Sequence, residues 1–205
     1  MHGLILRTFQ VFVQDTYGQE VWQGIAGRLP DEVQEFEAML NYSPEIFEAV
    51  IAATEAVLKK PRDSFLEDVG TYLVSHPNSE GLRRLLRFGG VDYIEFLHSL
   101  DDLPDRARLA VADLELPDLE LRDPDSRDGP HSRFRLTVGT GLPGFGYVMV
   151  GVLRAMADDY GALVLLDAEP CDDGAQEVEI TLIETAYAQG RDFELAGRAV
   201  GGGAG

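Results

Sequence analysis

Apolar residues in the first half of the chain recur at the three-to-four residue spacing of amphipathic helices. The three series are Leu4, Phe9, Phe12 and Val13; Val33, Phe36, Met39 and Leu40; and Ile46, Val50, Ile51 and Ala53. Ser43-Pro44 directly precedes the third series, and a proline after a serine cap is typical of the first turn of a helix. The pattern therefore predicts a helical amino-terminal half.

The second half of the chain changes to a period of two. Phe134, Leu136 and Val138 alternate with polar residues, which indicates a half-buried strand. The apolar run 145–160 predicts a helix, residues 162–166 and 178–183 predict two more strands, and the charged segment 122–132 predicts a loop. We therefore expect an α+β fold, with a helical amino-terminal lobe packed on a carboxy-terminal lobe that contains an antiparallel sheet and helices.

Short motifs with a characteristic order run along most of the chain. They are Met1-His2-Gly3-Leu4, Tyr17-Gly18 with Trp22, Leu66 to Leu73 around Gly70, Leu85 to Gly90, Ile94 to Asp105, and Gly151 to Gly161. In order and spacing they resemble the heme-nitric oxide/oxygen binding (H-NOX) family, the sensor domains related to the regulatory region of soluble guanylate cyclase. The resemblance implies one two-lobed domain over residues 1–185. Residues 186–205, which end in Gly201-Gly202-Gly203-Ala204-Gly205, are expected to form a carboxy-terminal extension with a flexible tail.

The segment that would carry the heme ligand departs from the family pattern. The family motif is F-L-x-x-L-D-x-L-H, in which the last residue is the sole protein ligand of the heme iron. Read without a gap from Phe96, that position is Pro104, which has no donor atom in its side chain. Because proline also cannot continue a helix interior, we expect the helix around Leu97 to break or kink at Pro104.

The positions that would hold the heme propionates are changed as well. Counted back from Gly151, the family's Y-x-S-x-R motif falls on Val138, Thr140 and Leu142, and only Thr140 keeps a hydroxyl. A register shifted by seven residues would place His131, Arg133 and Arg135 there instead. The resemblance thus implies a family member that does not bind histidine-ligated heme.

An apolar pocket between the lobes is nevertheless implied by the resemblance. Its inherited positions are Ile5, Phe9, Leu73, Pro104, Val138, Thr140, Leu142 and Phe145. Three hypotheses stay open: the pocket takes another tetrapyrrole or an apolar small molecule and signals to a cyclase- or kinase-type protein; heme is bound through a substitute ligand such as His76; or the pocket is closed and the domain is a cofactor-free regulatory interaction module. An internal cavity would separate the first from the last.

Composition limits the classes of partner, metal site and cellular location that we expect. The chain carries 36 acidic and 17 basic residues, a formal net charge of −19, which disfavours nucleic acid and anionic membrane surfaces as partners. The single cysteine, Cys171, cannot form an internal disulfide or a multi-cysteine zinc site, and no histidine has a partner at metal-ligand spacing. No signal peptide is evident, and no run approaches the roughly 20 apolar residues of a membrane span, so we expect a cytoplasmic protein.

Enzymatic activity is not expected. The paired carboxylates Glu67-Asp68 and Asp101-Asp102 have no adjacent histidine, cysteine or lysine to serve as a base or nucleophile. The glycine-rich segment 139–144 lacks the lysine and hydroxyl pair of a phosphate-binding loop.

Overall fold

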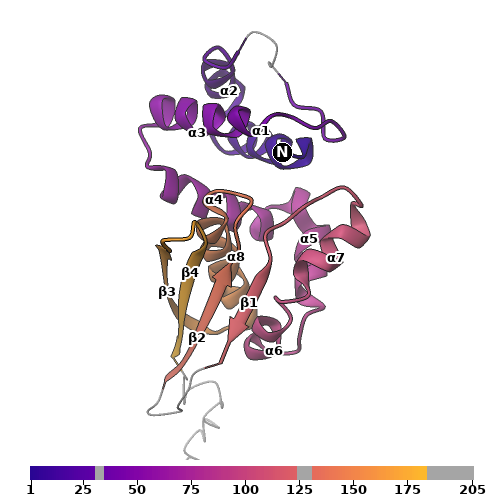
Figure 1. Ribbon diagram of the computed structural model, residues 1–205, viewed down its shortest axis with the longest axis vertical. Coiled ribbons are helices and arrows are strands. Elements are labelled where there is room, and N and C mark those ends of the chain that lie inside the picture. The colour runs from indigo at the N-terminus through magenta and orange to yellow at the C-terminus, as the bar shows by residue number, and fades with distance from the viewer. Residues whose placement is uncertain (31–34, 124–130, 184–205) are drawn as a thin grey trace, which may run out of the picture.

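Helices form the first half of the described chain, and a four-stranded sheet with one long helix forms the second (Figure 1). The computed structural model describes residues 1–30, 35–123 and 131–183. The helices are α1 (Gly3–Tyr17), α2 (Gln19–Ala26), α3 (Pro44–Leu58), α4 (Arg62–Ser75), the short 3₁₀ helix η1 (Pro77–Ser79), α5 (Glu80–Arg87), α6 (Tyr93–His98), α7 (Leu103–Ala110) and α8 (Phe145–Tyr160). The strands are β1 (Leu119–Arg122), β2 (His131–Val138), β3 (Leu163–Pro170) and β4 (Gln176–Ile183).

The first three helices stack as a separate layer at one end of the molecule (Figure 1). Aromatic rings of α1 join this layer to the rest, because Phe9 and Phe12 both pack on Phe65 of α4, with ring centroids 5.8 and 5.5 Å apart. Helix α3 begins as predicted, with Ser43 at the N-cap and Pro44 in the first turn.

The helix expected from Val33, Phe36, Met39 and Leu40 is not present in residues 35–42, which form turns; Val33 itself lies outside the described residues. Phe36 is buried, but Met39 is 81% exposed. The backbone of this segment bonds to the start of the chain instead of to itself. Gly3 N donates to Leu40 O at 2.7 Å, and Tyr42 N donates to Met1 O at 2.9 Å. The apolar spacing was therefore a wrong indicator here.

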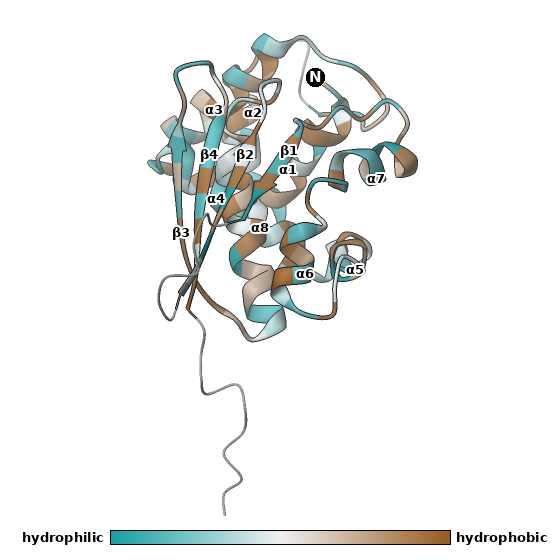
Figure 2. Ribbon diagram, turned by 60° about the horizontal axis from the view of Figure 1, so that its bottom comes forward, coloured by the Kyte–Doolittle hydropathy of each residue, from teal (hydrophilic) through white to brown (hydrophobic). Residues whose placement is uncertain are grey.

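The sheet is antiparallel throughout, with strand order β1-β2-β4-β3. The strands predicted from period-two alternation are confirmed, and Val178, Ile180 and Leu182 of β4 are buried on one face. Helix α8 covers that face, and Figure 2 shows apolar residues along both the helix and the strands. Strand β1 was not predicted: it is only four residues long, and its residues pair one-to-one with β2.

Helices α4 and α8 cross at two glycines. A Cβ atom added to Gly70 would lie 2.0 Å from Val148 O, and one added to Gly151 would lie 2.0 Å from Glu67 O. No side chain fits at either position, so the crossing requires glycine on both helices. This close pair forms the centre of the molecule.

The predicted break at Pro104 is confirmed. Helix α6 ends at His98, and α7 begins at Leu103 with Pro104 in its first turn, where a missing N–H costs no helical hydrogen bond. Across the described residues, no helix has the length and apolar character needed to cross a membrane.

Candidate functional site

A cavity of about 520 Å³ lies among α1, α4 and α8 on one side and α5 and α7 on the other. This volume is in the range of small-molecule and cofactor sites. Of the described residues, none that lines it has a charged side chain, and the polar ones are Thr8, Asn78 and Ser79. The apolar lining includes Leu4, Ile5, Phe9, Val69, Leu73, Leu82, Leu85, Leu86, Leu103, Ala107, Val111, Leu114, Leu142, Phe145, Val148, Met149 and Val152.

The elements around the cavity differ in how firmly they are held. Helices α4 and α8 are fixed at their glycine crossing, and they present Val69, Leu73, Val148 and Val152 to the cavity. Helix α7 buries only its first two residues, and Leu109 on it is 89% exposed. The cavity therefore has one rigid wall and one lightly packed wall.

Five of the eight predicted pocket residues line this cavity: Ile5, Phe9, Leu73, Leu142 and Phe145. The other three, Pro104, Val138 and Thr140, are not among its lining residues. Val138 points into the packed face of the sheet and is 1% exposed. Pro104 is buried beside Leu103, and it is Leu103 that reaches the cavity, because α7 starts a new helical register after the break. Thr140 lies in an adjoining cleft.

The contribution of α7 and the segment after it was missed from sequence. Leu103, Ala107, Val111 and Leu114 all line the cavity. Their spacing of four, four and three residues is that of one helix face, so the signal was present in the sequence.

The residues present do not fit a histidine-ligated heme, since no histidine, cysteine or tyrosine in the described ranges lines the cavity. Met149 does line it, but the thioether ligands of heme proteins accompany a histidine. Among the described residues, no group of three His, Cys, Asp or Glu side chains could hold a metal ion.

The candidate substitute ligand, His76, lies outside the cavity wall. Its ring stacks on Tyr72 with centroids 4.5 Å apart, and its Nδ1 accepts a hydrogen bond from Asn78 N at 3.3 Å. His98, on the other side of the molecule, has Nε2 3.4 Å from Asp123 Oδ1. Each of these histidines thus has a structural contact of its own, and neither faces the cavity.

A second hollow of about 1060 Å³ adjoins the cavity, and both are partly open to solvent; we call the second hollow the cleft. Cavity and cleft share the lining residues Ile5, Leu116 and Leu142, so they meet there. The cleft includes Thr140 and Leu142, two of the three positions on which the family resemblance placed the propionate motif.

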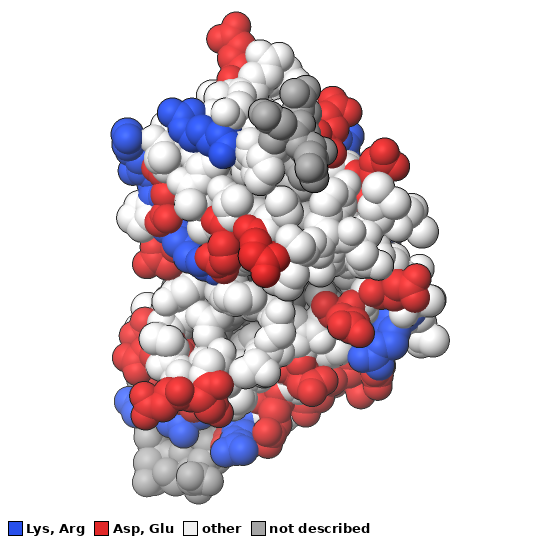
Figure 3. Space-filling view, turned by 45° about the horizontal axis from the view of Figure 1, so that its top comes forward, with Lys and Arg blue, Asp and Glu red and all other residues white. Residues whose placement is uncertain are grey.

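Most of the charged side chains that line the cleft are acidic. Its carboxylates are Glu45 and Glu48 from α3 and Asp113 and Glu115 from the segment after α7, and the one guanidinium that lines it in the described part of the chain is that of Arg108. Figure 3 shows acidic groups along the furrow between the two lobes. A hydrogen bond from its own backbone N–H, assisted by one from Ser43, lowers the pKa of Glu45, which keeps that carboxylate charged.

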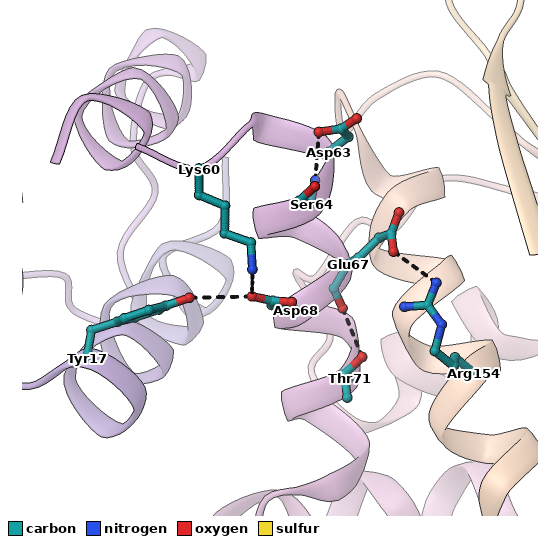
Figure 4. Close-up of polar contacts among 8 residues, drawn as sticks. All are labelled: Tyr17, Lys60, Asp63, Ser64, Glu67, Asp68, Thr71 and Arg154. Atoms are coloured by element: carbon teal, nitrogen blue, oxygen red, sulfur yellow. Dashed lines mark hydrogen bonds and ion pairs between the residues drawn. The ribbon is translucent and has the colours of Figure 1, made fainter. Parts of the chain in front are cut away.

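The paired carboxylates Glu67 and Asp68 have structural partners (Figure 4). Glu67 accepts from Arg154 of α8 at 3.0 Å, while Asp68 pairs with Lys60 and accepts from the Tyr17 hydroxyl at 3.4 Å. The two acids therefore point to different neighbours and connect α4 to α8 and to α1. This arrangement explains them as links between elements.

The fold is a two-lobed α+β domain with an apolar cavity among its helices. Residues 2–164 match the family model described as Haem-NO-binding, and the chain belongs to that family. The predicted family and fold class are thereby confirmed. The matched family is one of sensor domains.

Solved structures of low sequence identity show the same fold. A point mutant of the Fe(II) unliganded H-NOX protein from K. algicida superposes with a TM-score of 0.76 at 18% identity, over 92% of this chain and 100% of that one. A mutant H-NOX protein from S. oneidensis gives a TM-score of 0.71 at 14% identity, over 89% of this chain and 96% of that one.

Curated relatives are much longer than this chain. Soluble guanylate cyclase 89Db of Drosophila melanogaster is 22% identical over 163 residues, which cover 80% of this chain and 24% of that protein. Soluble guanylate cyclase gcy-34 of Caenorhabditis elegans is 27% identical over 161 residues, which cover 77% and 23%. The chain spans about a quarter of the length of these relatives. The predicted domain boundary at residue 185 and the glycine-rich tail lie outside the described residues and stay predictions.

Proposed function

We propose that this domain is a sensor whose cavity binds an apolar molecule in place of histidine-ligated heme, and that it passes the occupancy of the cavity to a signalling protein. The observation that carries the proposal is the apolar cavity of about 520 Å³, whose wall contains no histidine from the described residues. A domain that had simply lost its cofactor could fill this space with larger side chains, because closing a void restores dispersion contacts. Here Ala107 leaves room on the α7 wall.

The kind of partner is proposed from the curated relatives, and the element that would respond to a ligand is proposed from the packing. The relatives are named as soluble guanylate cyclases, and the matching region is a quarter of their length, so we propose a cyclase- or kinase-type partner in the cytoplasm. Helix α7 would be the responsive element, because it lines the cavity and buries few residues. A ligand against Ala107 and Val111 would press on the one wall that can move.

A second candidate is the cofactor-free interaction module. It is favoured by two side chains in the turn between α5 and α6, Phe88 and Val91, which are 89% and 85% exposed. Exposed apolar residues close together are typical of contact surfaces for other proteins. This candidate does not need the cavity to be occupied.

Titration with Nile Red, an uncharged fluorescent apolar dye, tests the sensor proposal. We expect saturable binding at one dye per protein and weaker binding in Ala107→Phe, which places a phenyl ring in the cavity. Leu109→Phe is the matched control, because this side chain is on the same helix but 89% exposed, and it should leave binding unchanged.

Two results would contradict the proposal, one from the dye titration and one from addition of heme. Absence of saturable dye binding to the natural sequence would favour the interaction module. A stoichiometric Soret band after addition of heme, with a shift on exposure to nitric oxide, would show that heme is bound through a ligand we have not placed.

A further inference from the structure

The apolar cavity and the charged cleft adjoin each other, and three residues line both. They are Ile5, Leu116 and Leu142. An elongated ligand whose apolar body fills the cavity would therefore place its end beside the cleft residues. The charge of the cleft then decides which end group is accepted.

Carboxylates dominate that charge. In the described part of the chain, four carboxylate side chains line the cleft, and the one guanidinium among its lining residues, Arg108, is 2.7 Å from Asp105. The nearby Arg62 is 2.6 Å from Glu48 and so already has an acidic partner. The amino group of Met1 also lines the cleft and donates to Tyr42 O at 2.9 Å.

Two of the carboxylates have no ion-pair partner. Within the residues that the structure describes, Asp113 and Glu115 form no ion pair, and both are exposed on the segment that follows α7. Glu45 of α3 also lines the cleft, and it forms hydrogen bonds without an ion pair to any described residue. Acidic groups from two separate segments of the chain thus line the space where a ligand's end would lie.

We infer that the cavity selects apolar ligands that end in a cation, such as an alkyl or aryl amine, and disfavours ligands that end in a carboxylate. The inference rests on the proposed ligand-binding function and narrows it. It also gives a second reason to expect that heme does not bind, because the two propionates would lie in a negatively charged cleft without the guanidinium of the family's Y-x-S-x-R motif. Of the two ligand classes left open by the sequence, it favours the apolar small molecule over a carboxylate-bearing tetrapyrrole.

The expected selectivity follows from Coulomb's law. A single carboxylate about 8 Å from a charged end group in a water-like medium changes affinity roughly twofold. Three unpaired carboxylates, less one charge for the Met1 ammonium group, therefore change it about fivefold. An amine should bind about fivefold more tightly than the matching neutral alcohol, and a carboxylate about fivefold more weakly. Salt should reduce both differences, because charges are screened over about 8 Å at 0.15 M ionic strength.

Displacement of Nile Red by decylamine, decanol and decanoate, which share one chain length, measures this selectivity. We expect the affinity order amine, alcohol, carboxylate at low salt and a smaller spread at about 0.5 M NaCl. The double variant Asp113→Asn/Glu115→Gln should reduce the preference for the amine roughly fourfold while leaving decanol unchanged. Asp158→Asn is the control, since Asp158 is exposed at the opposite end of α8.

The variant Ala107→Phe, which places a phenyl ring in the cavity, separates binding in the cavity from general attraction of amines to the acidic surface. If decylamine binds to that variant as tightly as to the natural sequence, its binding is on the surface and the inference is wrong. Equal affinity for the three ligands, or a preference for decanoate, would also overturn the inference while leaving the proposed sensor function intact. If neither the dye nor any of the three ligands binds to the natural sequence, the proposed function itself fails.

Discussion

Replacing Gly151 by alanine tests the crossing of α4 and α8 on which the cavity depends. The added Cβ would lie 2.0 Å from Glu67 O and 2.7 Å from Thr71 N, whereas ordinary contact begins at 3.4 Å. Both neighbours are backbone atoms of α4, so the helices must separate, because no side chain can turn aside. Overpacking of this kind costs about 1–3 kcal/mol, and because the obstacle is backbone we expect a net loss of about 2–3 kcal/mol despite alanine's better helix propensity.

Thermal and urea unfolding of the variant measures this loss. For a domain of this size, about 2–3 kcal/mol corresponds to a fall in Tm of about 5–10 °C. Gly24→Ala is the control. Gly24 lies within helix α2, and a Cβ atom there would meet only Val57 Cγ1, at 3.9 Å. Gly24→Ala should raise stability by up to about 1 kcal/mol. An unchanged or raised Tm for Gly151→Ala, alongside the expected gain at Gly24, would refute the close crossing and with it the fixed wall of the cavity.

Three further predictions concern the heme position, a buried tyrosine and an ion pair. Pro104→His alone should give no stoichiometric Soret band that shifts with nitric oxide, because position 104 is not on the cavity wall and the Y-x-S-x-R motif is still missing. Such a band in the variant would contradict the placement of Pro104 outside the cavity wall. Burial and a 2.6 Å hydrogen bond to Asp15 raise the pKa of Tyr72 from 10.0 to about 12, so its contribution to stability should be complete below about pH 10 and be lost as the pH rises through about 12. Urea unfolding at about pH 8 and about pH 11 should show a smaller pH dependence in Tyr72→Phe, and an equal dependence would show that this phenol is not responsible. Asp68→Asn should lower the free energy of unfolding by about 0.5–1 kcal/mol through loss of the partly exposed pair with Lys60, with Asp158→Asn as a neutral reference.

Features that depend on neighbours in the sequence were predictable without the structure. The start of α3 follows from the fixed φ of Pro44 in its first turn, although the Ser43 side chain forms no capping hydrogen bond. The break before α7 follows from the missing N–H of Pro104. The helix 145–160 follows from its long apolar run, and the strands follow from the alternation of apolar and polar residues. The family could also be predicted, because glycines such as Gly70 and Gly151 mark positions where a backbone contact excludes every other residue.

Features that depend on which distant residues meet were decided only by the tertiary structure. Strand β1 is too short to show a pattern and exists because β2 pairs with it, and residues 35–42 remain non-helical because their backbone bonds to Met1 and Gly3. Sequence placed Pro104 on the pocket, but packing placed Leu103 there. The acidic cleft joins Glu45 to Glu115, which are 70 positions apart in the sequence, and no periodicity connects such residues. Local backbone preferences act over a few residues and can be read along the chain, whereas the openness and charge of a cavity are sums over side chains that only folding brings together.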